Sequence, residues 1–124
     1  MSKEDFSVNG LAKKVLSMEE MLAAPDVEYR EVEAWGGLVR LGSLSAGEMI
    51  EFVEQNAADE KQKRIAGIRM ILRSMVNEQG ERIGKEEHVE SLLKKDALTT
   101  NRLVEVVMDM NGLNRAKVDE AKKG

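Results

Sequence analysis

The residues of this chain that could perform acid–base or metal chemistry are one histidine and two pairs of adjacent glutamates. His88 is the only histidine and lies in the stretch EEHVES, directly after Glu86 and Glu87. An imidazole beside carboxylates can act as a general base or as a metal ligand. A metal site needs several converging ligands, however, and the sequence has no second histidine and no cysteine to join His88. We therefore expect His88 to lie on a surface or in helix packing.

The carboxylates and glycines give no stronger signal for catalysis. Neighbouring side chains on a helix point about 100° apart, so Glu19–Glu20 and Glu86–Glu87 are expected to line solvated helix faces rather than a shared acid–base site. Gly36-Gly37 lacks the spacing of a phosphate-binding loop, and residues 77–87 lack the ligand spacing of a calcium loop. The sequence predicts no catalytic, metal or cofactor site, and a protein that is not an enzyme.

Charge and hydropathy exclude two classes of partner. The 124 residues carry a net charge of −4 at pH 7, whereas a general nucleic-acid binder needs a basic face to displace counterions from phosphates. No apolar run approaches the ~20 residues of a membrane span. The first ten residues include Glu4 and Asp5 in place of an apolar signal core. We expect no nucleic acid and no membrane among the partners, and a cytoplasmic location.

A β-hairpin and an N-terminal helix are the first elements that could position a binding surface. Apolar residues at helical spacing predict a helix from Leu11 that stops before Pro25. Residues 27–44 are rich in β-favouring side chains, and Gly36-Gly37 has the position of a two-residue hairpin turn. In this hairpin Val32 and Ala34 share one face, and Val39 and Leu41 share a face of the partner strand.

Helices are expected to follow the hairpin. Ser45 and Glu48 have the capping-box spacing that starts a helix, and residues 57–59 interrupt or bend that helix. Further helices are predicted over residues 60–80 and 86–95, and a last one is capped by Thr100 and stopped by Asn111-Gly112. The predicted fold is α+β: a mostly α-helical single domain over residues 11–113, with one small antiparallel β-hairpin packed on helices. Residues 1–10 are expected to be flexible, and the charged tail 114–124 to be disordered.

Two groups of residues could bind partners. Basic residues give the predicted middle helix a positive outer side, which either is a solvated face or contacts an acidic partner: Lys61, Lys63, Arg64, Arg69 and Arg73. The candidate partner-binding residues lie on the hairpin and on the helix after it: Trp35, Leu38, Val39, Met49 and Phe52. The same residues could instead form the core between the hairpin and the helices, with Trp35 as the anchor.

The order of these features resembles the tail assembly chaperones of long-tailed (siphovirus-type) bacteriophages and prophages. In that family a strand ending in Trp-Gly or Trp-Gly-Gly precedes a Val-Arg strand and a Leu-(Ser/Thr)-x-x-Glu helix start. The matching positions here are Trp35, Gly36, Gly37, Val39, Arg40, Leu44, Ser45 and Glu48. An acidic-x-x-Gly turn and a Glu-x-x-x-x-Leu helix then match Glu78–Gly80 and Glu87–Leu92. The resemblance covers residues 11–113 and depends on the ordered set of short motifs.

The resemblance implies a non-catalytic role in viral tail assembly. Such chaperones bind the tape measure protein, keep it soluble and help to recruit the major tail protein during virion morphogenesis. They act in the host bacterial cytoplasm and are not retained in the mature virion. Coating a long client favours several copies, so a homo-oligomer is a further expectation. Many members also have a longer form made by ribosomal frameshifting, for which Lys122-Lys123 offers a candidate slippery codon pair.

Two alternatives remain open on the sequence. A structural tail or head-completion protein would stay in the virion, although such proteins usually have more β structure and longer loops. A small hydrolase built around His88 would need catalytic partners that the sequence does not display.

Overall fold

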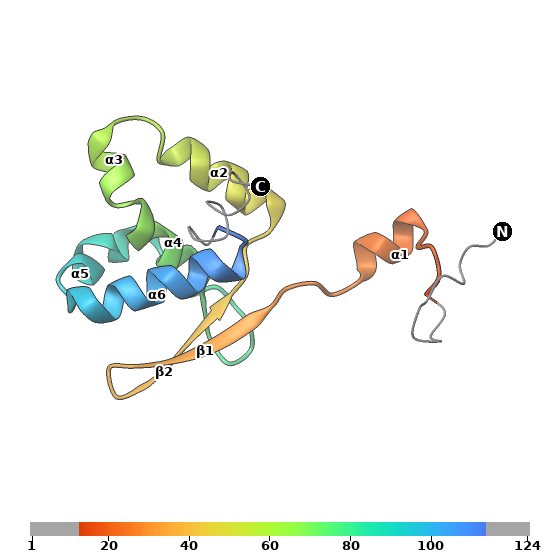
Figure 1. Cartoon of the computed structure of the whole chain (residues 1–124), viewed down its shortest axis with the longest axis horizontal. Helices are drawn as coiled ribbons and strands as arrows, with labels where there is room; N and C mark the ends of the chain where they lie inside the picture. The colour runs from red at the N-terminus through yellow and green to blue at the C-terminus, as the bar shows by residue number, and fades with distance from the viewer. Residues whose placement is uncertain (1–12, 114–124) are drawn as a thin grey trace, which may run out of the picture.

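The centre of the fold is a three-stranded antiparallel sheet in the order β1-β2-β3, covered on one face by helices (Figure 1). This computed structural model describes residues 13–113, so the predictions for residues 1–10 and 114–124, and for Leu11, lie outside the described residues. The elements in chain order are α1 (Met18–Ala23), β1 (Tyr29–Ala34), β2 (Gly37–Gly42), α2 (Ala46–Gln55), α3 (Glu60–Arg64), α4 (Ala66–Ser74), β3 (Met75–Val76), the 3₁₀ turn η2 (Glu86–His88), α5 (Val89–Leu93) and α6 (Ala97–Met110). The α+β class predicted from the sequence is confirmed.

The hairpin β1–β2 has the predicted faces but a different turn. Val32 pairs with Val39, and Ala34 pairs with Gly37, so the two central turn residues are Trp35 and Gly36 rather than Gly36 and Gly37. Their φ angles are 51° and 81°, the left-handed values that a two-residue type I′ turn requires at both positions. Trp35 is the only described residue other than glycine with a positive φ.

The third strand replaces the end of a predicted helix. The prediction of one helix over residues 60–80 is wrong, because α3 ends at Arg64 and α4 ends at Ser74. Met75 and Val76 then pair with Leu41 and Arg40 of β2. Ladder hydrogen bonds to a strand more than thirty residues earlier in the sequence therefore outweigh the local helical pattern.

The core lies between the sheet and helices α2, α4 and α6. Its buried members are mostly aliphatic: Leu41, Phe52, Met70, Ile71, Leu103, Val107 and Met110. α4 packs against both β2 and α6 and so joins the sheet to the longest helix. This aliphatic core fits a chain in which aromatic residues make up only 3% of the sequence.

Helix ends are set by side-chain caps. The Ser45/Glu48 capping box predicted for α2 is present, and Asp59 caps α3 after the predicted break. The cap of α6 is Asp96, not Thr100: the Asp96 carboxylate accepts from the backbone N–H and the hydroxyl of Thr99, which hold the pKa of Asp96 below its ordinary value. α6 ends where Asn111-Gly112 predicts.

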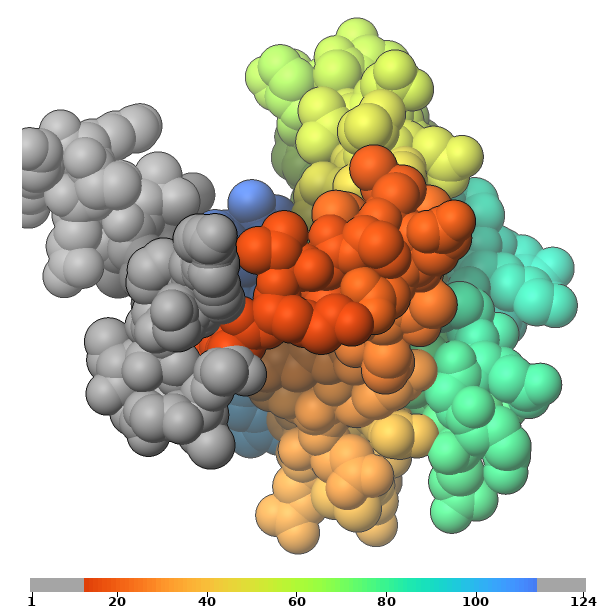
Figure 2. All heavy atoms as spheres, turned by 90° about the vertical axis from the view of Figure 1, so that its right-hand side faces the viewer, coloured from red at the N-terminus to blue at the C-terminus, as the bar shows by residue number. Residues whose placement is uncertain are grey.

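Helix α1 stands apart on an extended arm (Figure 1). It starts at Met18 because Ser17 and Glu20 form a capping box there, and none of its residues is buried. The helix predicted from Leu11 therefore has only its last part within the described residues. Figure 2 views the molecule from the side of the arm, whose orange-red side chains stand in front of the body.

Candidate partner-binding surface

The five predicted partner-binding residues divide between the core and the surface. Phe52 is buried in the core, and Val39 and Met49 pack against it half-buried. Leu38 is 66% exposed and Trp35 is 41% exposed, at the tip of the hairpin. Phe52 thus belongs to the core, and Val39 and Met49 lie at its edge. Trp35 is not the core anchor of the hairpin, because it occupies the turn, stays 41% exposed, and has its ring against Lys95 rather than in the core cluster.

The hairpin tip combines these two apolar side chains with two cations from the α5–α6 region. The Lys95 ammonium lies 5.0 Å from the centre of the Trp35 ring, a cation–π distance. Arg102 of α6 donates to the backbone carbonyl of Glu33 at 2.6 Å, which fixes the outer edge of β1. Trp35, Leu38 and Arg102 line an open hollow. We call Trp35, Leu38, Lys95 and Arg102 the tip surface.

The backbone of the turn gives the tip surface a fixed shape. A left-handed conformation is costly for a bulky residue, and asparagine or glycine is the usual choice at the first central position of this turn. Trp35 holds that position at φ 51°. Side chains kept in unfavourable backbone conformations concentrate at functional sites. The Trp35 conformation is therefore a specific reason to assign function to the tip.

An apolar groove lies on the other side of Lys95. It has a volume of about 300 Å³ and runs between the end of α4, residue 83 and α5. Its apolar lining is Leu72, Met75, Ile83 and Leu92, and its polar rim is His88, Ser91 and Lys95. We call it the α5 groove. None of its lining residues carries a carboxylate.

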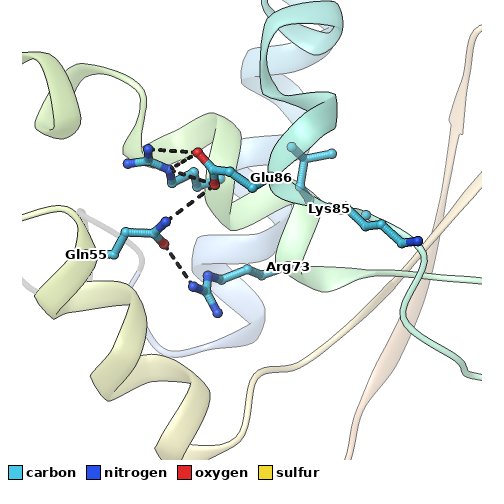
Figure 3. Close-up of a pocket in the computed structure, with 7 residues that line it drawn as sticks. Gln55, Arg73, Lys85 and Glu86 are labelled. Carbon is cyan, nitrogen blue, oxygen red and sulfur yellow. Dashed lines mark hydrogen bonds and ion pairs between the residues drawn. The ribbon is translucent and has the colours of Figure 1, made fainter.

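A polar network holds the segment that carries the α5 groove (Figure 3). The Arg69 guanidinium donates from Nε to both oxygens of Glu86 at 3.1 Å, and from Nη2 to Oε2 at 2.9 Å. Its Nη1 donates to Asn56 at 2.9 Å. The hydrogen bonds and charge of Arg69 hold the pKa of Glu86 below its ordinary value. Gln55 donates to Glu86 and accepts from Arg73, and so connects the two side chains. Lys85 points away from this network (Figure 3).

This network corrects two predictions. Arg69 lies 8% exposed on the inner side of α4, so the predicted basic outer face does not include it. Glu86 is not a freely solvated carboxylate, because it is the counter-ion of a buried guanidinium. The network's partners come from α2, α4 and η2, which are separated in sequence. No local pattern could have indicated it.

His88 takes part in a local turn at the surface. It is on the surface, its Nδ1 accepts from the backbone N–H of Lys85 at 3.0 Å, and its Nε2 lies 3.9 Å from Glu87. Within residues 13–113, no group of three or more His, Asp or Glu side chains could hold a metal ion. Here His88 helps to close the 3₁₀ turn before α5 and lines the rim of the groove.

The sequence does not predict the tip residues Lys95 and Arg102, because they reach Trp35 and Glu33 from more than fifty residues away.

Comparisons of the chain with protein-family models, with curated proteins and with solved structures found no match. In the described part of the chain, every helix is too short or too polar to cross a membrane.

Proposed function

We propose that this protein is a tail assembly chaperone that binds helical segments of the tape measure protein at its tip surface. The single observation that carries the proposal is the pair Trp35 and Leu38, which are exposed and line one hollow at the end of a hairpin whose turn keeps Trp35 in a left-handed conformation. The order of the motifs around Trp35 resembles that of the phage chaperones. The proposed role is non-catalytic.

The side chains of the tip surface are suited to binding an amphipathic helix. Tryptophan and arginine are the residues that most often carry the energy of protein interfaces, and an aromatic anchor works best when its position is fixed in advance. An amphipathic helix presents an apolar stripe flanked by charges. Trp35 and Leu38 can accept that stripe, while Lys95 and Arg102 attract carboxylates beside it. Exposed apolar helices of a long client would thus be covered before they aggregate.

Co-expression with the tape measure protein tests the proposal. The client should stay in the soluble fraction with this chain and precipitate without it, and the two should co-purify. Equal precipitation in both cases would reject the role.

Location distinguishes the proposed function from its rival. A chaperone that acts in the host cytoplasm and helps to bring in the major tail protein should not remain in purified virions. Stoichiometric amounts of this chain in mass spectra of the particles would instead favour a structural tail or head-completion protein.

A further inference from the structure

The outer side of β1 is an open edge of the sheet. β1 comes first in the order β1-β2-β3, and within residues 13–113 no strand pairs with its other side. Ala34 and Gly37 close the two-residue turn as a hydrogen-bonded pair. Because residues of an antiparallel ladder face the partner strand alternately, Glu33 and Glu31 direct their backbone N–H and C=O groups outward. The hydrogen bond from Arg102 to the Glu33 carbonyl agrees with this alternation.

Helix α6 runs along this edge on the helix-covered face of the sheet. Arg102 reaches Glu33, and Asp109 of the same helix accepts from Arg30 at 2.9 Å. These two α6 residues are about two helical turns apart and therefore share one face of the helix. Val106 lies between them on that face and packs half-buried against the core. A strand added to the edge would place every second side chain beside Val106, which favours apolar residues there.

The opposite face of the edge is acidic. Glu31 and Glu33 are exposed there. Three arginines lie near the edge, and each already has a partner: Arg30 bonds to Asp109, Arg102 to the Glu33 carbonyl, and Arg40 to the carbonyl of Glu78. Arg40 also lies 4.0 Å from the Glu31 carboxylate, at the limit of an ion pair, but the Glu31 side chain remains 56% exposed. None of the ion pairs within residues 13–113 includes Glu33. A neighbouring strand would meet two accessible carboxylates, which favours basic side chains on this face.

We propose that the outer edge of β1 binds an extended segment of a partner protein, as a fourth strand in which basic side chains alternate with apolar ones. In strand addition, main-chain hydrogen bonds provide affinity and the alternate side chains provide specificity. A second copy of this chain is a poor occupant, because antiparallel pairing of two β1 strands about Glu31 sets carboxylate against carboxylate. The site goes beyond the proposed binding of client helices and uses neither Trp35 nor Leu38.

Amide hydrogen exchange of the free protein tests whether the edge is open. The amides of Val32 and Ala34 face β2 and should exchange at least about tenfold more slowly than those of Glu31 and Glu33, after correction for intrinsic rates. Equal protection of the two sets would overturn the proposal.

The probe for binding is a peptide as long as β1 in which lysine and valine alternate. At millimolar peptide, the backbone NMR signals of Glu31 and Glu33 should shift, and their amides should become at least about tenfold better protected. One control peptide has the same composition with the lysines and valines in two blocks, and another alternates glutamate with valine. Neither control should protect these amides. No protection by the alternating lysine peptide, or equal protection by a control, would overturn the proposal.

A proline at the centre of the edge gives the sharper readout. Glu31→Pro removes the outward N–H and leaves the ladder to β2 intact, since proline is tolerated where the N–H of an edge strand faces solvent. Glu31→Gln is the matched control, because it loses the charge and keeps the N–H. The peptide should bind Glu31→Pro at least about tenfold more weakly than Glu31→Gln, the effect of one lost hydrogen bond. Equal binding by the two folded variants would overturn the proposal.

Methylated peptides provide the same test on the wild-type protein if Glu31→Pro does not fold. One peptide is methylated at the backbone nitrogens of its lysines, and the other at those of its valines. Only one of these sets faces the edge in a paired strand, so one peptide should lose binding and the other should keep it. Equal binding of both peptides would overturn the proposal.

Discussion

The Arg69 guanidinium donates hydrogen bonds to both carboxylate oxygens of Glu86 at 2.9–3.1 Å, although Arg69 is buried and Glu86 is largely exposed. The pair crosses from α4 to η2, and Asn56 at the end of α2 completes it. A buried guanidinium needs such partners because an unpaired charge in a protein interior is costly. This contact connects the helical core to the segment that carries the α5 groove.

Replacing Glu86 should destabilise the fold. Glu86→Gln leaves the Arg69 charge without its counter-ion and should lower the free energy of unfolding by about 1–3 kcal/mol. Urea denaturation measures this change. The matched control is Glu87→Gln, an exposed neighbour that should change stability by no more than about 0.5 kcal/mol. Equal effects of the two substitutions would contradict a stabilising role for the pair.

Acid should remove the stabilisation that the Glu86 carboxylate gives to the fold. Arg69 holds the pKa of Glu86 below the ordinary value of 4.5, so the stabilisation is complete above that pH and is lost as pH falls through the lower, folded-state pKa. The difference in unfolding free energy between wild type and Glu86→Gln should therefore shrink only below about pH 4.5. A difference that shrinks already near neutral pH, or never shrinks in acid, would assign the effect to another group.

Gly84 should tolerate no side chain. A Cβ at this position would lie 2.1 Å from the carbonyl oxygen of Leu72 in α4, so the backbone must move to admit it. Gly84→Ala should cost about 3 kcal/mol or more, at the upper end of overpacking effects. Thermal and urea denaturation report the change. Gly37→Ala is the control, since a Cβ there meets nothing within 4 Å. Equal stability of both variants would contradict the close approach.

The sequence predicts the parts of this fold that depend on local patterns. Alternation places Val32, Ala34, Val39 and Leu41 on one face, as the register confirms. The turn lies one residue earlier than the glycine pair predicts, because glycine pairs are a usual choice for a type I′ turn and nothing in the local pattern indicates that a tryptophan takes a left-handed conformation.

Non-local contacts could not be predicted in the same way. β3 forms because residues 75–76 meet β2, and Arg69 is buried because Glu86 reaches it from a different segment. The candidate site follows the same rule: the hairpin carries Trp35 and Leu38, but its cations come from beyond residue 94. The periodicity of residues within a short window indicates none of these contacts.

We infer that Trp35 is kept for binding at some cost to folding. Trp35→Asn puts the preferred residue in the left-handed turn position and should keep or raise stability, by up to about 1 kcal/mol. It also removes the aromatic anchor and the Lys95 contact. Ile50→Gln, at a 60% exposed position of α2 outside the tip surface, is the matched control for the loss of a surface apolar group.

The most direct test is to co-express the tape measure protein with wild type, Trp35→Asn or Ile50→Gln and to measure the soluble fraction of the client. We predict that wild type and Ile50→Gln keep the client soluble, and that Trp35→Asn, although as stable as wild type, does not. A stable Trp35→Asn protein that solubilises the client as well as wild type does would contradict the account.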